Sequence, residues 1–215
     1  FLKNRHEPYV IISSGDCVYK MDYNDLLEFH IAKKADITIA CKDMPADADV
    51  SRFGVVRMNE DSRITDFEEK PKNPKSNHAS MGVYIFKKDV LIEELIRDEK
   101  DKTSQNDFGK NIIPYMLKSG KKLYAYCFTG YWKDVGTVTS LWEANMDLLG
   151  DHPAINLNEP DMKIYSRNEP LPPSYIGETG NVINSVFTAG CEINGTIINS
   201  VVSEDVAIGK GSVIR

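Results

Sequence analysis

Residues 9–16 have the sequence YVIISSGD, and this stretch decides the fold class. Four apolar or aromatic residues in succession, three of them β-branched, predict a strand buried on both faces of a parallel sheet. Asp16 follows this strand closely. Open α/β sheets place their ligand crevice beyond the carboxyl ends of the strands, so a carboxylate here suits Mg²⁺ shared with a phosphate. Equally, Asp16 could cap the next helix.

The chain downstream continues the alternation of strands and helices. Apolar residues recur at roughly helical spacing over residues 21–31, and residues 36–41 (DITIAC) predict a second buried strand, which completes a βαβ unit. Residues 53–58 and 63–68 predict a hairpin. Further strands are predicted at 81–86 and 122–128, with helices at 89–97, from 106 or 107 to 119, and from 137 onward.

The composition is that of a soluble globular protein with a core of its own. The 215 residues are 41% hydrophobic and 27% charged, and the net charge of −6 gives no sign of a nucleic-acid or acidic-membrane partner. No apolar run approaches about 18 residues, so no membrane span is predicted. The four cysteines lie far apart without a CxxC pair, which predicts reduced thiols in a cytoplasmic protein.

The pattern changes beyond the first predicted domain, residues 1–149. Residues 150–173 are rich in Pro, Asn and Asp and predict a connection between domains. A cysteine and four aliphatic residues then recur at steps of six, five, six and six: Cys191, Ile197, Val202, Ile208 and Ile214. This spacing is typical of a parallel β-helix with about three hexads per coil, so residues 174–215 are expected to hold little more than one coil. The alternative is a pair of irregular strands.

A short motif after the hairpin has the chemistry of a phosphate site. Glu69, Lys70 and Pro71 follow a predicted strand directly, and because proline cannot continue the ladder, Lys70 is expected at a fixed strand end. A fixed ammonium suits a phosphate monoester, and the neighbouring carboxylate could accept hydrogen bonds from sugar hydroxyls. Taken alone, however, this common tripeptide favours a solvated loop.

Residues 130–137 (GYWKDVGT) place a second acid between a strand and a helix. The glycines allow a backbone to approach a ligand closely, and Asp134 could complete a two-carboxylate Mg²⁺ site with Asp16; its alternative role is helix capping. Ser80, before the strand at 81–86, is a candidate hydroxyl donor or merely a turn residue. No nucleophile-plus-base pair is evident, which favours chemistry in which the substrates supply the nucleophile and the leaving group.

Six segments form an ordered set along the chain: residues 14–23 (SGDCVYKMDY), 52–55 (RFGV), 67–71 (FEEKP), 79–84 (ASMGVY), 107–110 (DFGK) and 131–137 (YWKDVGT). Each segment is weak alone, but the set is highly specific and extends from the first strand to the hexads. Together they resemble the bacterial glucose-1-phosphate adenylyltransferases, also called ADP-glucose pyrophosphorylases.

The resemblance implies an α/β nucleotidyltransferase domain with a Rossmann-like mixed sheet, followed by the start of a left-handed parallel β-helix. It implies the reaction of Mg-ATP with glucose 1-phosphate to give ADP-glucose and pyrophosphate, the activating step of glycogen synthesis. By similarity, Asp16 and Asp134 match the family's catalytic, metal-associated aspartates, and Lys70 matches its catalytic sugar-phosphate lysine. The positions that line the glucose 1-phosphate pocket match Gly54, Glu69 and Ser80.

The chain departs from the family at its start. An N-terminal glycine-rich loop, whose arginine holds the ATP phosphates in the family, has no counterpart here. We therefore expect a fragment that begins about halfway into the domain, which leaves its own activity open. The resemblance also implies a cytoplasmic, allosteric homotetramer, or a hetero-oligomer with a regulatory subunit.

Three alternative functions remain open from the sequence. A non-catalytic regulatory subunit should have lost its acids or its lysine, whereas Asp16, Lys70 and Asp134 are all intact. A related nucleotidyltransferase for another sugar phosphate or nucleotide would keep these residues. A hexapeptide-repeat acyltransferase would need more coils and a histidine among them, and none of the four histidines lies there.

Overall fold

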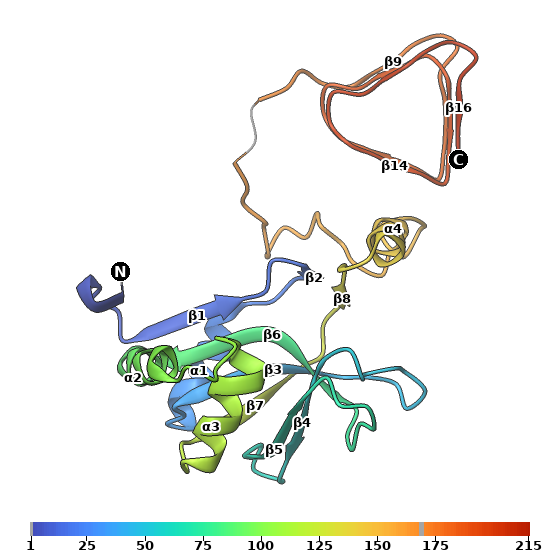
Figure 1. Ribbon diagram of the computed structural model, residues 1–215. Helices are drawn as coiled ribbons and strands as arrows, with labels where there is room; N and C mark the ends of the chain where they lie inside the picture. The colour runs from blue at the N-terminus through green and yellow to red at the C-terminus, as the bar shows by residue number, and fades with distance from the viewer. Residues whose placement is uncertain (1, 168–169) are drawn as a thin grey trace. The chain divides into compact units, whose positions relative to one another are not determined.

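The computed structural model describes residues 2–167 and 170–215 and divides into two compact units. The first unit comprises Phe1–Trp132 and the second Lys133–Arg215. Figure 1 shows the sheet and helices of the first unit and the stacked, coiled strands of the second. Each unit has a hydrophobic core of its own.

A mixed sheet forms the centre of the first unit (Figure 1). Its strands are β1 (Tyr9–Ser13), β3 (Ile37–Asp43), β4 (Gly54–Met58), β5 (Ile64–Glu69), β6 (His78–Lys87) and β7 (Leu123–Phe128). They lie in the order β5-β4-β6-β3-β7, and β1 also pairs with β6. Because β6 is antiparallel to β1, β3 and β4 while β3 and β7 are parallel, the predicted mixed sheet is confirmed.

Helices cover both faces of this sheet. They are the short 3₁₀ helix η1 (Leu2–Asn4), α1 (Tyr23–Ala32), α2 (Lys88–Lys100), the π-helical η2 (Phe108–Ile112) and α3 (Ile113–Lys118). Side chains alternate along β3: Ala40 belongs to the cluster that contains Leu26 of α1, whereas Ile39 and Cys41 belong to the cluster with η2 and α3. Successive strand residues point to opposite faces, so α1 packs on one face and η2 and α3 on the other.

The strand β1 differs from its prediction. It pairs antiparallel with β6, in the register Ile11↔Ile85, and β6 is its only partner among the described strands. Ile11 is 42% exposed, so the prediction of burial on both faces of a parallel sheet is wrong. The reason is that β6 lies between β1 and β3 and runs opposite to both. The predicted βαβ unit therefore spans an intervening strand.

Most other predicted elements of this unit are present. The hairpin of β4 and β5 is antiparallel, as expected. The helix predicted to start at 106 or 107 begins as η2 behind Asp107, whose side chain accepts a hydrogen bond from Lys110 N at 2.8 Å, and it continues as α3. β6 begins at His78, so Ser80 lies inside a strand and not in a turn before it.

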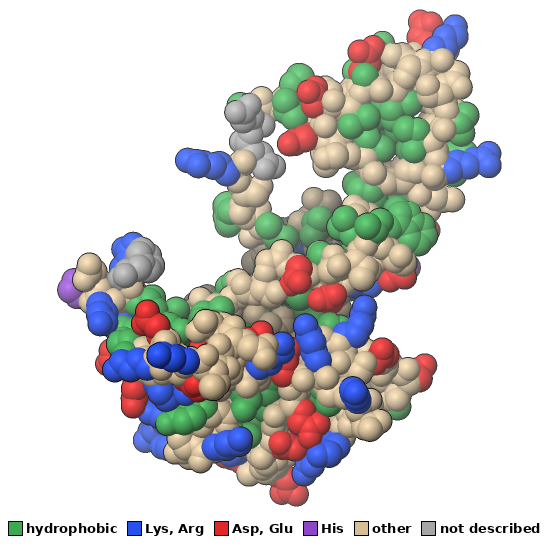
Figure 2. All heavy atoms as spheres, in the orientation of Figure 1, with side chains coloured by type: hydrophobic (Ala, Val, Ile, Leu, Met, Phe, Trp, Pro, Cys, Tyr) green, Lys and Arg blue, Asp and Glu red, His purple; other side chains and the backbone are tan. Residues whose placement is uncertain are grey.

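Charged side chains of both signs are mixed over the visible face of the first unit (Figure 2). Several of them form ion pairs, such as Lys33 with Asp61 at 2.5 Å and Lys75 with Glu68 at 2.8 Å. Exposed pairs of this kind contribute about 0–1 kcal/mol each. The stability of the unit therefore depends mainly on its apolar clusters.

His30 of α1 is a buried titratable group. Its Nδ1 lies 2.8 Å from Thr38 Oγ1, and its ring meets the edge of Tyr9 at 5.3 Å. The pKa of His30 is lowered to about 4, chiefly by burial and also by the charge of Lys87, while the charge of Asp36 opposes the shift. The folded state therefore keeps the imidazole neutral.

We expect stability to fall as the pH drops from about 6.5 toward about 4. In this window the unfolded chain binds a proton at His30, whose ordinary pKa is about 6.5, while the folded chain does not. In this window the free energy of unfolding should fall by at most about 1.4 kcal/mol per pH unit because of this group, and it should change little above about pH 7.5. Urea denaturation should show a shallower acid decline for His30→Gln than for the wild type. Equal slopes would exclude His30 as the cause.

The second unit begins within β8 (Trp132–Asp134), which is followed by α4 (Val138–Met146). Thr137 and Ser140 form a capping box, in which Thr137 Oγ1 accepts a hydrogen bond from Ser140 N at 3.1 Å. The helix predicted from residue 137 is therefore confirmed. None of the described helices, in either unit, combines the length and the apolar character needed to cross a membrane.

Short parallel strands then stack into coils (Figure 1). They are β9 (Tyr175–Ile176), β10 (Asn181–Ile183), β11 (Val186–Phe187), β12 (Glu192–Ile193), β13 (Thr196–Ile198), β14 (Val201–Val202), β15 (Ala207–Ile208) and β16 (Val213–Ile214). Partners on neighbouring coils include Asn181↔Thr196 and Tyr175↔Glu192. The paired residues lie 15 and 17 positions apart, so each coil is slightly shorter than the 18 residues of three hexads. The parallel strands confirm the predicted β-helix and exclude irregular strands.

The extent of the β-helix was underestimated from the hexads. Two of its three sheets contain three strands and the other contains two, so the chain completes two coils and begins a third. The first coil starts at Tyr175, ahead of the regular aliphatic spacing. Four of the five hexad residues are buried together, whereas Ile214 in β16 is 37% exposed. At a corner, Asn184 Nδ2 donates to Asn199 Oδ1 at 2.8 Å, and both residues have positive φ, which asparagine tolerates.

Candidate functional site

Asp16 lies in the turn between β1 and the short strand β2 (Cys17–Tyr19). Its Oδ1 accepts a hydrogen bond from Ser14 Oγ, and the residue is exposed. Gly82 allows this turn to pass close to β6, because a Cβ at Gly82 would lie 2.9 Å from Ser14 Cβ. The N-cap of α1 is Asp22, which accepts from Asn24 N, so the capping alternative for Asp16 is wrong. Asp16 is a carboxylate at a strand end, as predicted.

Glu69, the last residue of β5, is held between two glycine backbones. A Cβ at Gly54 of β4 would lie 2.9 Å from Glu69 Oε2, and a Cβ at Gly109 of η2 would lie 2.6 Å from Glu69 Cδ. Real Cβ atoms do not come this close, so glycine is required at both positions for this placement of the carboxylate. The predicted pocket residues Gly54 and Glu69 are therefore neighbours. Gly109, which the sequence did not suggest as a site residue, packs its backbone against the other side of the Glu69 side chain.

The electrostatics around Glu69 are those of a partly desolvated acid. Burial raises the pKa of the Glu69 carboxyl, and the negative charge of Asp107 raises it further. Lys70 and Lys110 oppose this rise. Asp107 therefore caps η2 and also acts on Glu69 through its charge. It is not among the site residues predicted from the sequence.

Two hydroxyls from β6 complete the surroundings of this carboxylate. Ser80 is 7% exposed, and its side chain forms a hydrogen bond with the Tyr84 hydroxyl. The pKa of Tyr84 is raised to about 12, chiefly by burial; the bond with Ser80 opposes this shift, and the charge of Glu69 contributes to it. Tyr84 also packs against Phe108 of η2, with ring centroids 6.0 Å apart. The structure therefore brings Gly54 and Glu69 together, and Ser80 is linked to them only through Tyr84.

Lys70 follows Glu69 in a constrained backbone conformation. Its φ is 49°, in the left-handed region, and its N–H donates to Phe53 O at 3.0 Å. Such a conformation costs a non-glycine residue about 1 kcal/mol or more and often occurs at functional sites. The side chain is exposed, and its charge acts on the Glu69 carboxyl. A freely solvated loop does not require this fixed backbone.

Asp134 belongs to the second unit, at the end of β8. Its Oδ1 accepts a hydrogen bond from Gly136 N at 3.2 Å. The capping alternative for Asp134 is wrong, because Thr137 is the N-cap of α4. Within that unit, the neighbouring Lys133 pairs with Asp147 at 2.7 Å. The pairing of Asp134 with Asp16 around one metal ion stays a prediction.

Comparison with known proteins places the chain in a family. Residues 1–150 match the family described as nucleotidyl transferase. The chain belongs to the nucleotidyl transferase family. This nucleotidyl transferase is 53% identical over 213 residues to a glucose-1-phosphate adenylyltransferase of Clostridium beijerinckii. The aligned residues make up 99% of this chain and 55% of that protein. It is 51% identical over 214 residues to the enzyme of the same name from Bacillus licheniformis, over 100% of this chain and 56% of that protein.

The resemblance expected from the six segments is thus confirmed. The chain of this nucleotidyl transferase spans about half the length of the curated relatives it matches. Nucleotidyl transferases generally use a divalent metal ion. Carboxylates at strand ends, such as Asp16, carry the hard oxygen donors that such ions prefer.

The glycine walls around Glu69 can be tested by stability. Gly109→Ala should lower the free energy of unfolding by about 1–3 kcal/mol, because the new methyl group overlaps the Glu69 side chain. In a Glu69→Ala background the same change should cost less, since the overlapping atoms are gone. Urea denaturation of the four proteins in this cycle measures the coupling. Gly209→Ala, whose Cβ would meet nothing closer than 3.9 Å, is the control. Additive effects at Gly109 and Glu69 would contradict the geometry.

Proposed function

We propose that the protein containing this chain is a glucose-1-phosphate adenylyltransferase. It would convert ATP and α-D-glucose 1-phosphate into ADP-glucose and diphosphate, the activating step of glycogen synthesis. The single observation that carries the proposal is the position of the Glu69 carboxylate against the backbones of Gly54 and Gly109, where its charge acts on the Tyr84 hydroxyl. The names of the relatives, which align with nearly the whole chain, support the same reaction.

The sugar end of the substrate fits the residues around Glu69. A carboxylate can accept hydrogen bonds from two sugar hydroxyls, and the Ser80 and Tyr84 hydroxyls can donate or accept. Gly54 leaves room for a close approach because it carries no side chain. Lys70 would provide a compact positive charge for the phosphate at the adjacent strand end. These groups together recognise a polyhydroxylated ring that carries a phosphate.

Asp16 and Asp134 are proposed to hold Mg²⁺. Support comes from their carboxylate oxygens, which Mg²⁺ prefers as ligands, and from the packing of residues close to each aspartate in the chain. Trp132, two residues before Asp134, packs within the first unit on the cluster that contains Met81. Cys17, next to Asp16, lies 3.9 Å from the carbonyl oxygen of Met81 through its Sγ. A bound Mg²⁺ would neutralise charge on the transferred phosphate and orient it.

The reaction needs no covalent intermediate on the protein. An oxygen of the sugar phosphate attacks the α-phosphorus of ATP in line, and pyrophosphate leaves. The protein contributes by holding the two phosphates close together and by stabilising the charge that moves between them. Lys70 would hold the attacking phosphate, and Glu69 would fix the ring so that this phosphate points at ATP.

The finer organisation of the whole protein is also a proposal. We propose residues 1–149 as the nucleotidyltransferase part, 150–173 as a connection and 174–215 as the start of a left-handed β-helix. A cytoplasmic, allosteric homotetramer, or a hetero-oligomer with a regulatory subunit, fits this arrangement. Partly exposed apolar residues on the coils, among them Ile176 and Ile183, offer contact area to a neighbour.

A substrate panel tests the proposed function. The protein containing this chain would be incubated with ATP, CTP, GTP or UTP and with glucose, galactose or mannose 1-phosphate, and the sugar nucleotides separated by chromatography. ADP-glucose should be the main product, with kcat/KM at least about tenfold above any other pair. Preference for another pair would assign a different nucleotidyltransferase. Folded protein that makes no product would favour a regulatory subunit.

A further inference from the structure

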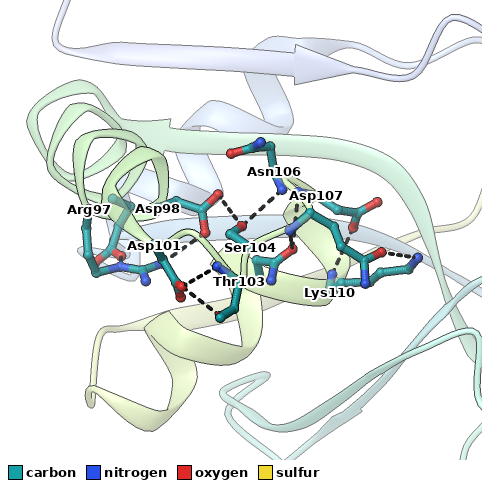
Figure 3. A network of polar contacts seen from close by, with 11 residues as sticks. Arg97, Asp98, Asp101, Thr103, Ser104, Asn106, Asp107 and Lys110 are labelled. Carbon is teal, nitrogen blue, oxygen red and sulfur yellow. Dashed lines mark hydrogen bonds and ion pairs between the residues drawn. The ribbon is translucent and has the colours of Figure 1, made fainter.

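A polar network joins the end of α2 to the start of η2 (Figure 3). Its base is Asp98, which is only 3% exposed. Ser104 Oγ donates a hydrogen bond to Asp98 Oδ2 at 2.8 Å and accepts one from Asn106 N at 3.0 Å. Arg97 lies 3.7 Å from the other oxygen of Asp98 and 2.9 Å from Glu94. The loop after α2 is therefore tied to a buried carboxylate through one hydroxyl.

The same loop is held from its other side by η2. Asn111 Oδ1 accepts hydrogen bonds from Gln105 N at 3.2 Å and from Asp107 N at 3.3 Å. Lys110 Nζ donates to Gln105 Oε1 at 2.9 Å, and Lys110 N donates to Asp107 Oδ1 at 2.8 Å. Two of these bonds reach Asp107, one at its backbone N–H and one at its carboxylate (Figure 3). The backbone and the carboxylate of Asp107 are both fixed.

The bonds fix the backbone at the turn into η2. Asn106, between Ser104 and Asp107, has a φ of 54°, in the left-handed region. Asparagine tolerates this conformation, but it is one of several that the residue can adopt. The Ser104 bond to Asn106 N and the Asn111 bond to Asp107 N select this conformation from the two sides. Loss of either should let the loop relax.

The loop leads directly to the wall of the proposed sugar site. Asp107 acts electrostatically on Glu69 and Tyr84, and Gly109 presses its backbone against the Glu69 side chain. A small shift of Asp107 would therefore change the seat of Glu69. We propose that Asp98, Ser104 and Asn111 are positioning residues that set the affinity of the sugar site through Asp107 and Gly109, an inference that rests on the proposed function.

Ser104→Ala is the decisive variant, and Thr103→Ala is its matched control. Thr103 Oγ1 donates to Asp101 Oδ1 at 2.7 Å in the same loop, but this pair has no bond to Asp107. In the protein containing this chain, Ser104→Ala should raise the KM for glucose 1-phosphate about tenfold and leave kcat and the KM for ATP within about twofold. Ser104→Thr, which keeps the hydroxyl, should restore the KM. Thr103→Ala should change none of these values.

Hydrogen exchange supplies a readout that does not need activity. Backbone amides of residues 105–112 should exchange at least about tenfold faster in Ser104→Ala than in Thr103→Ala. A wild type that makes no ADP-glucose would overturn the proposed function, and exchange would still decide whether Ser104 holds Asp107. Unchanged exchange overturns the inference in either case. Equal losses in kcat and both KM values, without rescue by Ser104→Thr, also overturn it, because they indicate a general structural defect.

Discussion

Asp16→Asn should lower kcat by about 10²–10³-fold or more while changing the free energy of unfolding by less than about 1 kcal/mol. An amide keeps the size of the carboxylate but loses the charge that attracts Mg²⁺. Stability should be nearly unaffected because Asp16 is exposed and does not cap a helix. The measurements are kcat at saturating substrates over a range of Mg²⁺ concentrations, and urea denaturation.

The control for this prediction is Asp22→Asn, which changes a nearby exposed acid that caps α1. Asparagine is as good an N-cap as aspartate, so this variant should keep both turnover and stability. If Asp16 and Asp134 share one metal, Asp134→Asn should cause a similar loss, and the double variant should lose little more than either single one. Near-normal turnover of Asp16→Asn would exclude a metal role for Asp16. If the loss of kcat in the double variant equals the product of the two single losses, the two carboxylates do not share one metal ion.

Lys70→Gln should raise the KM for glucose 1-phosphate by about 10²–10³-fold, with kcat and the KM for ATP little changed. A charge pair at about 4 Å and an effective dielectric of about 20 is worth up to about 4 kcal/mol before desolvation, and each 1.4 kcal/mol is about tenfold in affinity. Glutamine keeps most of the side-chain length but cannot supply the charge. Steady-state kinetics with each substrate varied in turn gives the three constants.

Two further variants separate the charge of Lys70 from its backbone. Lys72→Gln removes an exposed lysine just beyond Pro71 and should leave the KM unchanged. Lys70→Gly removes the charge but suits the positive φ, so it should raise the KM while increasing the free energy of unfolding by roughly 0.5–1 kcal/mol. A normal KM in Lys70→Gln would remove Lys70 from the sugar-phosphate site.

Local patterns were sufficient for most elements of the first unit, but not for all of the neighbours of those elements. Turn residues and caps such as Thr137 and Asp107 act within a few positions of themselves, so the sequence predicted the helices that they begin. The surroundings of β1 depend on β6, which is about seventy residues away in the chain and inserts between β1 and β3. The residues of β1 cannot show which strand will pair with them.

The same distinction holds at the site. The sequence could propose Asp16 and Glu69 because each comes at the end of a strand whose pattern is visible. Tyr84 and Asp107 were missed as site residues because their importance comes from facing Glu69, which a linear pattern does not show. Gly109 has no local signal, since the side chain that it accommodates belongs to another element. The sequence could have pointed to Gly109 only through the family resemblance, because DFGK is one of the six segments that carry it.

The central claim is adenylyl transfer to glucose 1-phosphate, and the most direct test is pyrophosphate release. The protein containing this chain would be mixed with Mg-ATP, with and without glucose 1-phosphate, and pyrophosphate followed continuously. We predict release that requires the sugar phosphate, equals the ADP-glucose formed and is nearly abolished in Asp16→Asn. Folded wild-type protein that releases no pyrophosphate with both substrates present, or releases it equally without the sugar phosphate, would contradict the account.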